Sequence, residues 1–139
     1  MIVLDTNVVS ELMKTEVDAA LLGWLNQQPR LSIWVSTITV FEIRLGIGLL
    51  PASRRRMQLE QSFMRMLSEK IENRTLPFDT AAAEQAATLS AARQRSGRLG
   101  ELRDTMIAGI AISRRATLAT RNTRHFADLP TPVVNPWTG

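Results

Sequence analysis

Three acidic residues, Asp5, Glu42 and Asp104, lie where a sheet protein would place chemically active side chains. Asp5 directly follows the apolar run 2–4, which is typical of a strand buried on both faces. Glu42 lies within the first two turns of a predicted helix, and Asp104 opens the most apolar helical segment. Ligands of open α/β sheets bind at the carboxyl ends of the strands. We therefore expect these carboxylates to gather at one edge of a sheet.

Carboxylates at close range repel one another, so they are stable as anions only when a cation neutralises them. An all-oxygen site selects Mg²⁺ or Mn²⁺, which binds phosphate oxygens and activates an attacking water. The chain carries 15 Arg, 2 Lys and a net charge of +4, which favours a polyanionic partner. This combination predicts phosphodiester hydrolysis. The arginines that could line the path of a nucleic acid are Arg54, Arg55, Arg56, Arg93, Arg95, Arg98, Arg103, Arg114, Arg115, Arg121 and Arg124.

Each acid also has a purely structural explanation. Asp5 could cap a helix by accepting a backbone N–H. Thr39 and Glu42 have the Thr-x-x-Glu spacing of a capping box, and Asp104 could simply favour the positive end of a helix. The functional interpretation is preferred because all three explanations would otherwise have to coincide at one sheet edge.

Short strand patterns alternate with helical patterns along the whole chain. We expect strands at 2–4, 33–36, 74–78, 117–120 and 133–135, and helices at 17–26, 37–50, 53–73, 80–96 and 102–113. Prolines on both sides of the last strand confine it to a sheet edge. This alternation predicts a single α/β domain over residues 1–139, with a mainly parallel central sheet of about five strands and helices on both faces.

Composition narrows the cellular setting. The chain has no cysteine, and no apolar stretch approaches the roughly 20 residues of a membrane span. The apolar run at the N-terminus is short, has no basic region before it and meets an acid at once, unlike a secretory signal. We expect a cytoplasmic protein that does not enter a membrane.

Six segments carry motifs that occur in the same order in one known family: IVLDTNVVSE at 2–11, STITVFEIRLG at 36–46, LPFD at 76–79, DTMIA at 104–108, ATRNTRHF at 119–126 and NPW at 135–137. In these motifs the chain resembles the PIN-domain ribonucleases, in particular the VapC and FitB type toxins of bacterial toxin–antitoxin pairs. The resemblance covers essentially the whole chain.

This resemblance implies an endoribonuclease whose metal-binding acids are Asp5, Glu42 and Asp104, with Mg²⁺ or Mn²⁺ as cofactor. It implies that Thr6, Asn7 and Thr120 support the site through hydrogen bonds. It further implies an RNA substrate, a homodimer, and a cognate antitoxin whose tail fills the acidic groove.

The chain departs from the family pattern after the fourth predicted strand. Asn122 stands where several relatives have Asp, and His125 stands at another position that is often acidic. An amide can still ligate or orient a ligating water, but it removes one charge and weakens the case for a second metal ion. We expect His125 to be a surface or hydrogen-bonding residue, and Asp128 to lie in an ordinary turn.

Two other functions compete with the nuclease. A haloacid dehalogenase-like phosphatase also begins with a strand ending in Asp, but it needs a second Asp two residues later, where this chain has Asn7. A weakly active or inactive PIN-like module that binds RNA or a protein partner would be consistent with Asn122 and the basic surface. Metal-dependent RNA cleavage distinguishes the nuclease from this binding module.

Overall fold

All five strands form one parallel sheet in the computed structural model, which describes residues 1–139. Their order across the sheet is β3-β2-β1-β4-β5. Crossing helices connect strands that run in the same direction, as the alternating pattern predicts. The strands are β1 (Ile2–Leu4), β2 (Ile33–Ser36), β3 (Thr75–Leu76), β4 (Thr117–Ala119) and β5 (Val133–Val134).

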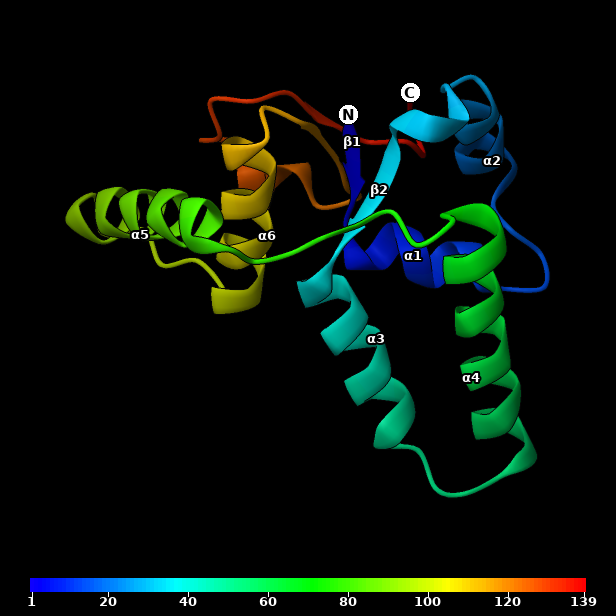
Figure 1. Cartoon of the computed structure of the whole chain (residues 1–139). Coiled ribbons are helices and arrows are strands. Elements are labelled where there is room, and N and C mark those ends of the chain that lie inside the picture. Colours follow the sequence, from blue (N-terminus) through cyan, green and yellow to red (C-terminus); the bar gives the residue numbers. More distant parts are fainter.

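Helices cover both faces of this sheet, which confirms the expected α/β architecture (Figure 1). Leu4 points into one core, which it shares with residues of α1 to α4, whereas Val3 points into a second core beside α5 and α6. The central strand is therefore apolar on both faces. The helices are α1 (Thr6–Leu12), α2 (Ala19–Asn26), α3 (Thr37–Gly48), α4 (Arg54–Arg65), α5 (Thr80–Arg95) and α6 (Leu102–Ser113).

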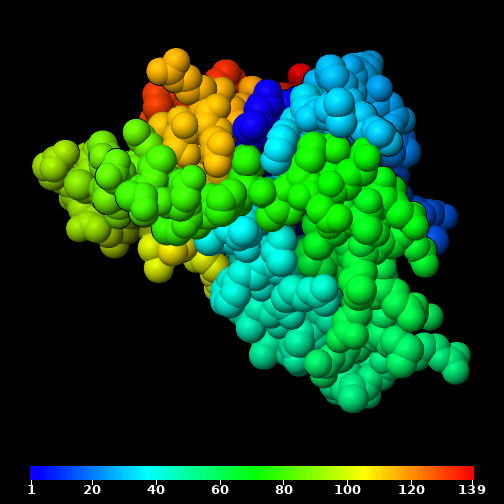
Figure 2. All heavy atoms as spheres, viewed as in Figure 1, coloured from blue at the N-terminus to red at the C-terminus, as the bar shows by residue number.

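Helices α3 and α4 extend away from the sheet as a projecting arm, which is visible in both overall views (Figures 1 and 2). The sequence pattern predicts one long helix over 53–73, but α4 ends at Arg65 and continues as a π-helical turn, η2 (Met66–Lys70). In this turn the Ile71 N–H donates to the Met66 carbonyl, and both side chains are buried. The wider turn thus lets two residues five positions apart join the core.

Other differences are local. A short helix, α1, begins directly after Asp5, where the sequence pattern gave no helix. Strand β5 lies at the sheet edge, as its flanking prolines predict. No helix is both long and apolar enough to cross a bilayer.

Helices α5 and α6 approach each other closely at Gly109. A Cβ placed there would lie 2.5 Å from the Ala82 carbonyl oxygen and 2.8 Å from the Ala86 Cβ. Gly109→Ala is therefore expected to lower the free energy of unfolding by about 1–3 kcal/mol, measured by urea denaturation. The matched control is Gly46→Ala in α3, which meets open space and should gain up to about 1 kcal/mol. Equal stability of both variants would contradict this packing.

Candidate active site

The three predicted acids come from three different elements. Asp5 follows β1 directly, Glu42 lies in the second turn of α3, which follows the neighbouring strand β2, and Asp104 lies in the first turn of α6. Asp5 is only 4% exposed, whereas the other two side chains are partly accessible. Both Glu42 and Asp104 act electrostatically on Asp5. The structure thus places a buried carboxylate beside two more accessible ones at the carboxyl edge of the sheet.

Hydrogen bonds fix both oxygens of Asp5. Its Oδ1 accepts from the backbone N–H of Thr6 at 2.8 Å, so Asp5 is also the N-cap of α1. Its Oδ2 accepts from the Thr120 hydroxyl at 2.7 Å and from the Asn7 amide at 3.3 Å. The Asn122 backbone N–H in turn donates to the Thr120 hydroxyl oxygen. The residues after β4 therefore hold the carboxylate that follows β1.

A row of hydroxyl groups ends on Glu42. The Ser36 hydroxyl donates to the Thr39 oxygen, which lies 3.0 Å from the Thr6 oxygen. The Thr6 hydroxyl donates to Glu42 Oε1 at 2.7 Å. The N-cap of α3 is Ser36, whose oxygen accepts from the Thr39 N–H, so the capping-box explanation of Thr39 and Glu42 is wrong. Thr39 instead lies fully buried in this row.

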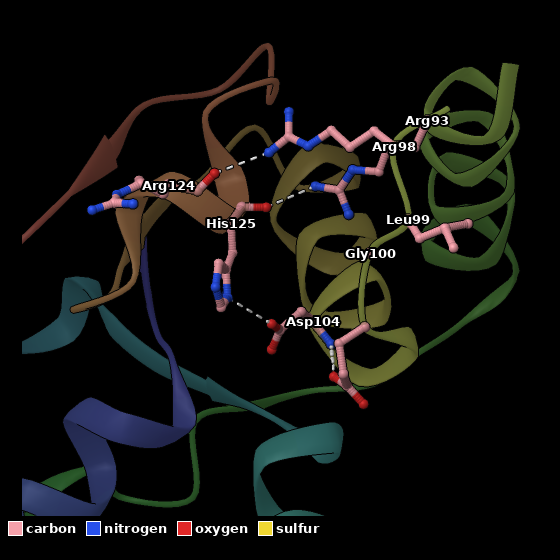
Figure 3. Close-up of a pocket in the computed structure, with 8 residues that line it drawn as sticks. Arg93, Arg98, Leu99, Gly100, Asp104, Arg124 and His125 are labelled. Carbon is pink, nitrogen blue, oxygen red and sulfur yellow. Dashed lines mark hydrogen bonds and ion pairs between the residues drawn. The ribbon is translucent and has the colours of Figure 1, made fainter. Parts of the chain in front are cut away.

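Asp104 has a different set of neighbours (Figure 3). Its Oδ2 lies 3.3 Å from His125 Nδ1, and its backbone N–H donates to the Glu101 side chain, which caps α6. His125 is largely exposed and hydrogen-bonded. These residues line a hollow of about 160 Å³ together with Arg93, Arg98, Leu99, Gly100 and Arg124.

The environment makes negative charge costly at two of the three acids. Burial, assisted by the nearby Asp104 and Glu42 charges, raises the pKa of Asp5 from 3.8 to about 6, although hydrogen bonds from Thr120 and Thr6 oppose the shift. Burial and the Glu101 carboxylate raise the pKa of Asp104. A bound cation would offset this cost and favour the ionised form of both carboxylates.

The oxygen donors suit a hydrated hard ion. No three Asp, Glu or His side chains lie close enough together to ligate one ion directly. Mg²⁺ commonly keeps several waters and binds through one or two carboxylates, so a trio of direct ligands is not required. The buried, hydrogen-bonded Asp5 and its two acidic neighbours fit such an ion.

Two of the arginines expected along a nucleic-acid path differ in how exposed their side chains are. Arg103 is partly exposed and its Nη1 lies 3.9 Å from Glu42 Oε2. Arg93 is buried and paired with Asp128, so its expected place on a nucleic-acid path is wrong. Asp128 is likewise occupied by this ion pair. Nothing in the basic pattern of α5 distinguishes Arg93 from its exposed neighbours.

Comparison with known proteins decides the family. The family model described as the PIN domain matches residues 2–131. The chain belongs to the PIN domain family. Among PIN relatives, it is 38% identical over 137 residues to "VapC ribonuclease Y4jK" of Sinorhizobium fredii, which covers 99% of this chain and 98% of that relative. It is 39% identical to "Plasmid stability protein StbB" of Pseudomonas syringae pv. tomato, over 99% of both chains.

Solved PIN structures agree with this placement. The FitAcB structure from Neisseria gonorrhoeae superposes with a TM-score of 0.82 at 32% identity, covering 99% of each chain. The DNA-bound VapBC structure from Salmonella typhimurium gives 0.78 at 27% identity, with 97% of each chain covered. The resemblance to VapC and FitB type proteins that the sequence motifs indicate is therefore confirmed, together with the fold that it implies.

Proposed function

We propose that this chain is a divalent-metal-dependent endoribonuclease that serves as the toxin of a toxin–antitoxin pair. The proposal rests on one observation above all: a PIN-family chain gathers Asp5, Glu42 and Asp104 at the carboxyl edge of its sheet. Its relatives include proteins named as a VapC ribonuclease and as toxin FitB. The basic composition of the chain is also consistent with RNA as substrate.

In this proposal Asp5, Glu42 and Asp104 hold Mg²⁺ or Mn²⁺, directly or through water. When bound, such an ion supplies a Lewis acid for the phosphate and lowers the pKa of the attacking water. The chain contributes orientation. Thr120 fixes Asp5 and Thr6 fixes Glu42, each through a hydrogen bond of 2.7 Å. Such supporting hydrogen bonds set the direction in which a carboxylate presents its free oxygen lone pairs.

The RNA backbone would be held by exposed arginines around the acids. A second hollow, of about 400 Å³, is lined by Arg121, Asn122, Thr123, Arg124 and His125 and adjoins the first through the last two of these residues. The Arg121 guanidinium lies over the Trp137 ring, 4.9 Å from its centre. Because arginines neutralise phosphates and release counterions, RNA binding should weaken steeply as salt rises.

The test incubates the purified chain with a set of defined RNAs in Mg²⁺ or Mn²⁺, with and without EDTA. Cleavage that appears only with the ion supports the proposal. RNA binding that persists in EDTA with no cleavage in either ion would overturn it in favour of a PIN-like binding module. Asn122 supplies no charge, so the ion concentration needed for half-maximal cleavage also reports how well the three acids hold it.

Thr6→Val tests the hydroxyl row. The substitution keeps the shape of the side chain but leaves Glu42 without its 2.7 Å donor. We expect cleavage to fall about 10-fold, because loss of a supporting hydrogen bond typically costs 10- to 100-fold in metal affinity or activity. Thr88→Val is the control, since the Thr88 hydroxyl bonds only to the Glu84 carbonyl on α5. Equal rates for both variants would contradict a role for Thr6.

We also propose a cognate antitoxin, a homodimeric state and a cytoplasmic place of action. Solved relatives include complexes of VapBC and FitAB. Large apolar side chains exposed on the α3–α4 arm offer a surface for a second protein chain: Phe41, Leu45, Leu49, Met57 and Met64. Growth arrest on expression, relieved by co-expression of a small DNA-binding protein encoded beside the chain, tests the antitoxin. Light scattering on the purified chain tests the dimer.

A further inference from the structure

A buried arginine contacts the two segments that carry Asp104 and His125. Arg93, in the last turn of α5, is 4% exposed. Its Nε and Nη2 donate to the two oxygens of Asp128 at 2.8 and 2.9 Å. Nη2 also donates to the His125 carbonyl at 2.9 Å, and Nη1 donates to the Thr105 hydroxyl at 3.1 Å. Four of the five N–H groups of the guanidinium are therefore used.

These contacts join the two segments that carry Asp104 and His125. Thr105 immediately follows Asp104 on α6, and His125 belongs to the short 3₁₀ turn η3 (Thr123–Phe126). Figure 3 shows the Arg93 guanidinium reaching the His125 carbonyl while the His125 ring turns the other way, toward Asp104. A single turn of 3₁₀ helix has few hydrogen bonds of its own. Arg93 therefore helps to fix this turn against α6, and Arg98 adds a bond from its Nη2 to the Arg124 carbonyl at 2.9 Å.

The space around the guanidinium is closely filled. A Cβ placed on Gly100, in the loop before α6, would lie 2.5 Å from Arg93 Nη1 and 3.3 Å from the Thr105 hydroxyl oxygen. The loop backbone thus passes directly against the guanidinium. Lysine could keep the positive charge beside Asp128, but its ammonium is a point charge and cannot reproduce the planar fork. The site is shaped for arginine.

We propose that Arg93 is a positioning residue, which holds Asp104 and His125 at their working separation by fastening η3 and α6 to the end of α5. The inference rests on the proposed ribonuclease function. Arg93 bonds to neither Asp5 nor Glu42, and four of its five N–H groups are already used within the protein. Its loss should therefore act on the rate of cleavage and not on the binding of substrate.

The decisive variant is Arg93→Lys, compared with Arg74→Lys. Arg74 is a matched control because it is also well buried, with 11% of its side chain exposed. It donates to the Ile33 and Arg30 carbonyls at 2.8 Å, at the opposite end of β2. Both substitutions break a guanidinium fork and keep the charge. Only Arg93 contacts the segments that carry Asp104 and His125.

Cleavage of one defined RNA is measured at a temperature where circular dichroism shows both variants folded. We expect Arg93→Lys to lower kcat about 10-fold or more with KM within about twofold of the original chain. Arg74→Lys should leave both constants within about twofold. An unchanged kcat in Arg93→Lys, or an equal loss in Arg74→Lys, would overturn the inference.

Gly100→Ala gives an independent test because it displaces the guanidinium without altering any charge. It should lower kcat as Arg93→Lys does, and normal activity in this variant would count against the proposal. Amide hydrogen exchange provides a readout separate from cleavage. Arg93→Lys should speed exchange about 10-fold at His125 and Leu129, whose N–H groups bond within the held segment, and Arg74→Lys should not. Unchanged exchange in Arg93→Lys would refute the positioning role, whether or not the chain cleaves RNA. Absence of cleavage by the original chain would refute the proposed function and leave the exchange result to decide the role of Arg93.

Discussion

Asp5→Asn is expected to reduce RNA cleavage at least about 100-fold while the chain remains folded. The amide keeps the size of the side chain and can still accept from the Thr6 N–H, but it removes the most buried negative charge of the site. Without that charge the two remaining acids would hold a divalent ion poorly. The measurement is the initial rate of cleavage of a defined RNA in saturating Mg²⁺ or Mn²⁺.

Asp18→Asn is the control for this experiment. Asp18 caps α2 by accepting from the N–H groups of Ala20 and Leu21, and an Asn retains this ability. It makes the same chemical change at a helix start away from the site. Cleavage by Asp5→Asn at the rate of Asp18→Asn would show that the proposed acids do not carry the reaction.

The second large effect concerns stability against pH in the absence of divalent ions. The pKa of Asp5 is about 6 in the folded chain and 3.8 ordinarily, so the folded state binds the proton more tightly. The contribution of the Asp5 carboxyl to the free energy of unfolding is complete below about pH 4 and is lost as the pH rises through about 6. The loss amounts to about 3 kcal/mol, at 1.36 kcal/mol for each pH unit between the two pKa values.

Urea denaturation of the original chain and of Asp5→Asn in EDTA isolates this contribution from other titrations. At pH 7.5 the variant should be the more stable by up to about 3 kcal/mol, and at pH 4 the difference should nearly vanish. Added Mg²⁺ or Mn²⁺ should stabilise only the original chain, because a ligand stabilises the state that binds it. The same difference at both pH values would show that burial does not perturb Asp5.

The sequence pattern predicts the fold well because the pattern is local. Val3 and Leu4 enter separate cores on opposite faces of the sheet, and this is the reason that β1 is apolar without alternation. The proline pair around β5 correctly indicated an edge strand. The π-helical turn after α4 could not be predicted, since it depends on which side chains the assembled core can accept.

From the residues alone the candidate site was predictable only at its acids, whereas the family resemblance also pointed to Thr6, Asn7 and Thr120, which bond to Asp5 or Glu42. Asp5 also shows why the alternatives were hard to separate, because it caps α1 and faces the other carboxylates at once. The contact between Thr6 and Glu42 depends on how α1 packs beside α3, which no spacing within either segment reveals. Arg93 resembles its exposed neighbours in sequence, and only the tertiary fold sets it apart.

The hydroxyl row that ends on Glu42 also bears on how such chains can diverge. Each hydroxyl has one proton to give, so the row from Ser36 through Thr39 and Thr6 must be oriented in one sense toward its carboxylate. Replacing one of these hydroxyl residues leaves a neighbouring group without its hydrogen-bond donor or acceptor, where water is largely excluded. We therefore expect the three hydroxyl residues to be kept together or replaced together in related chains.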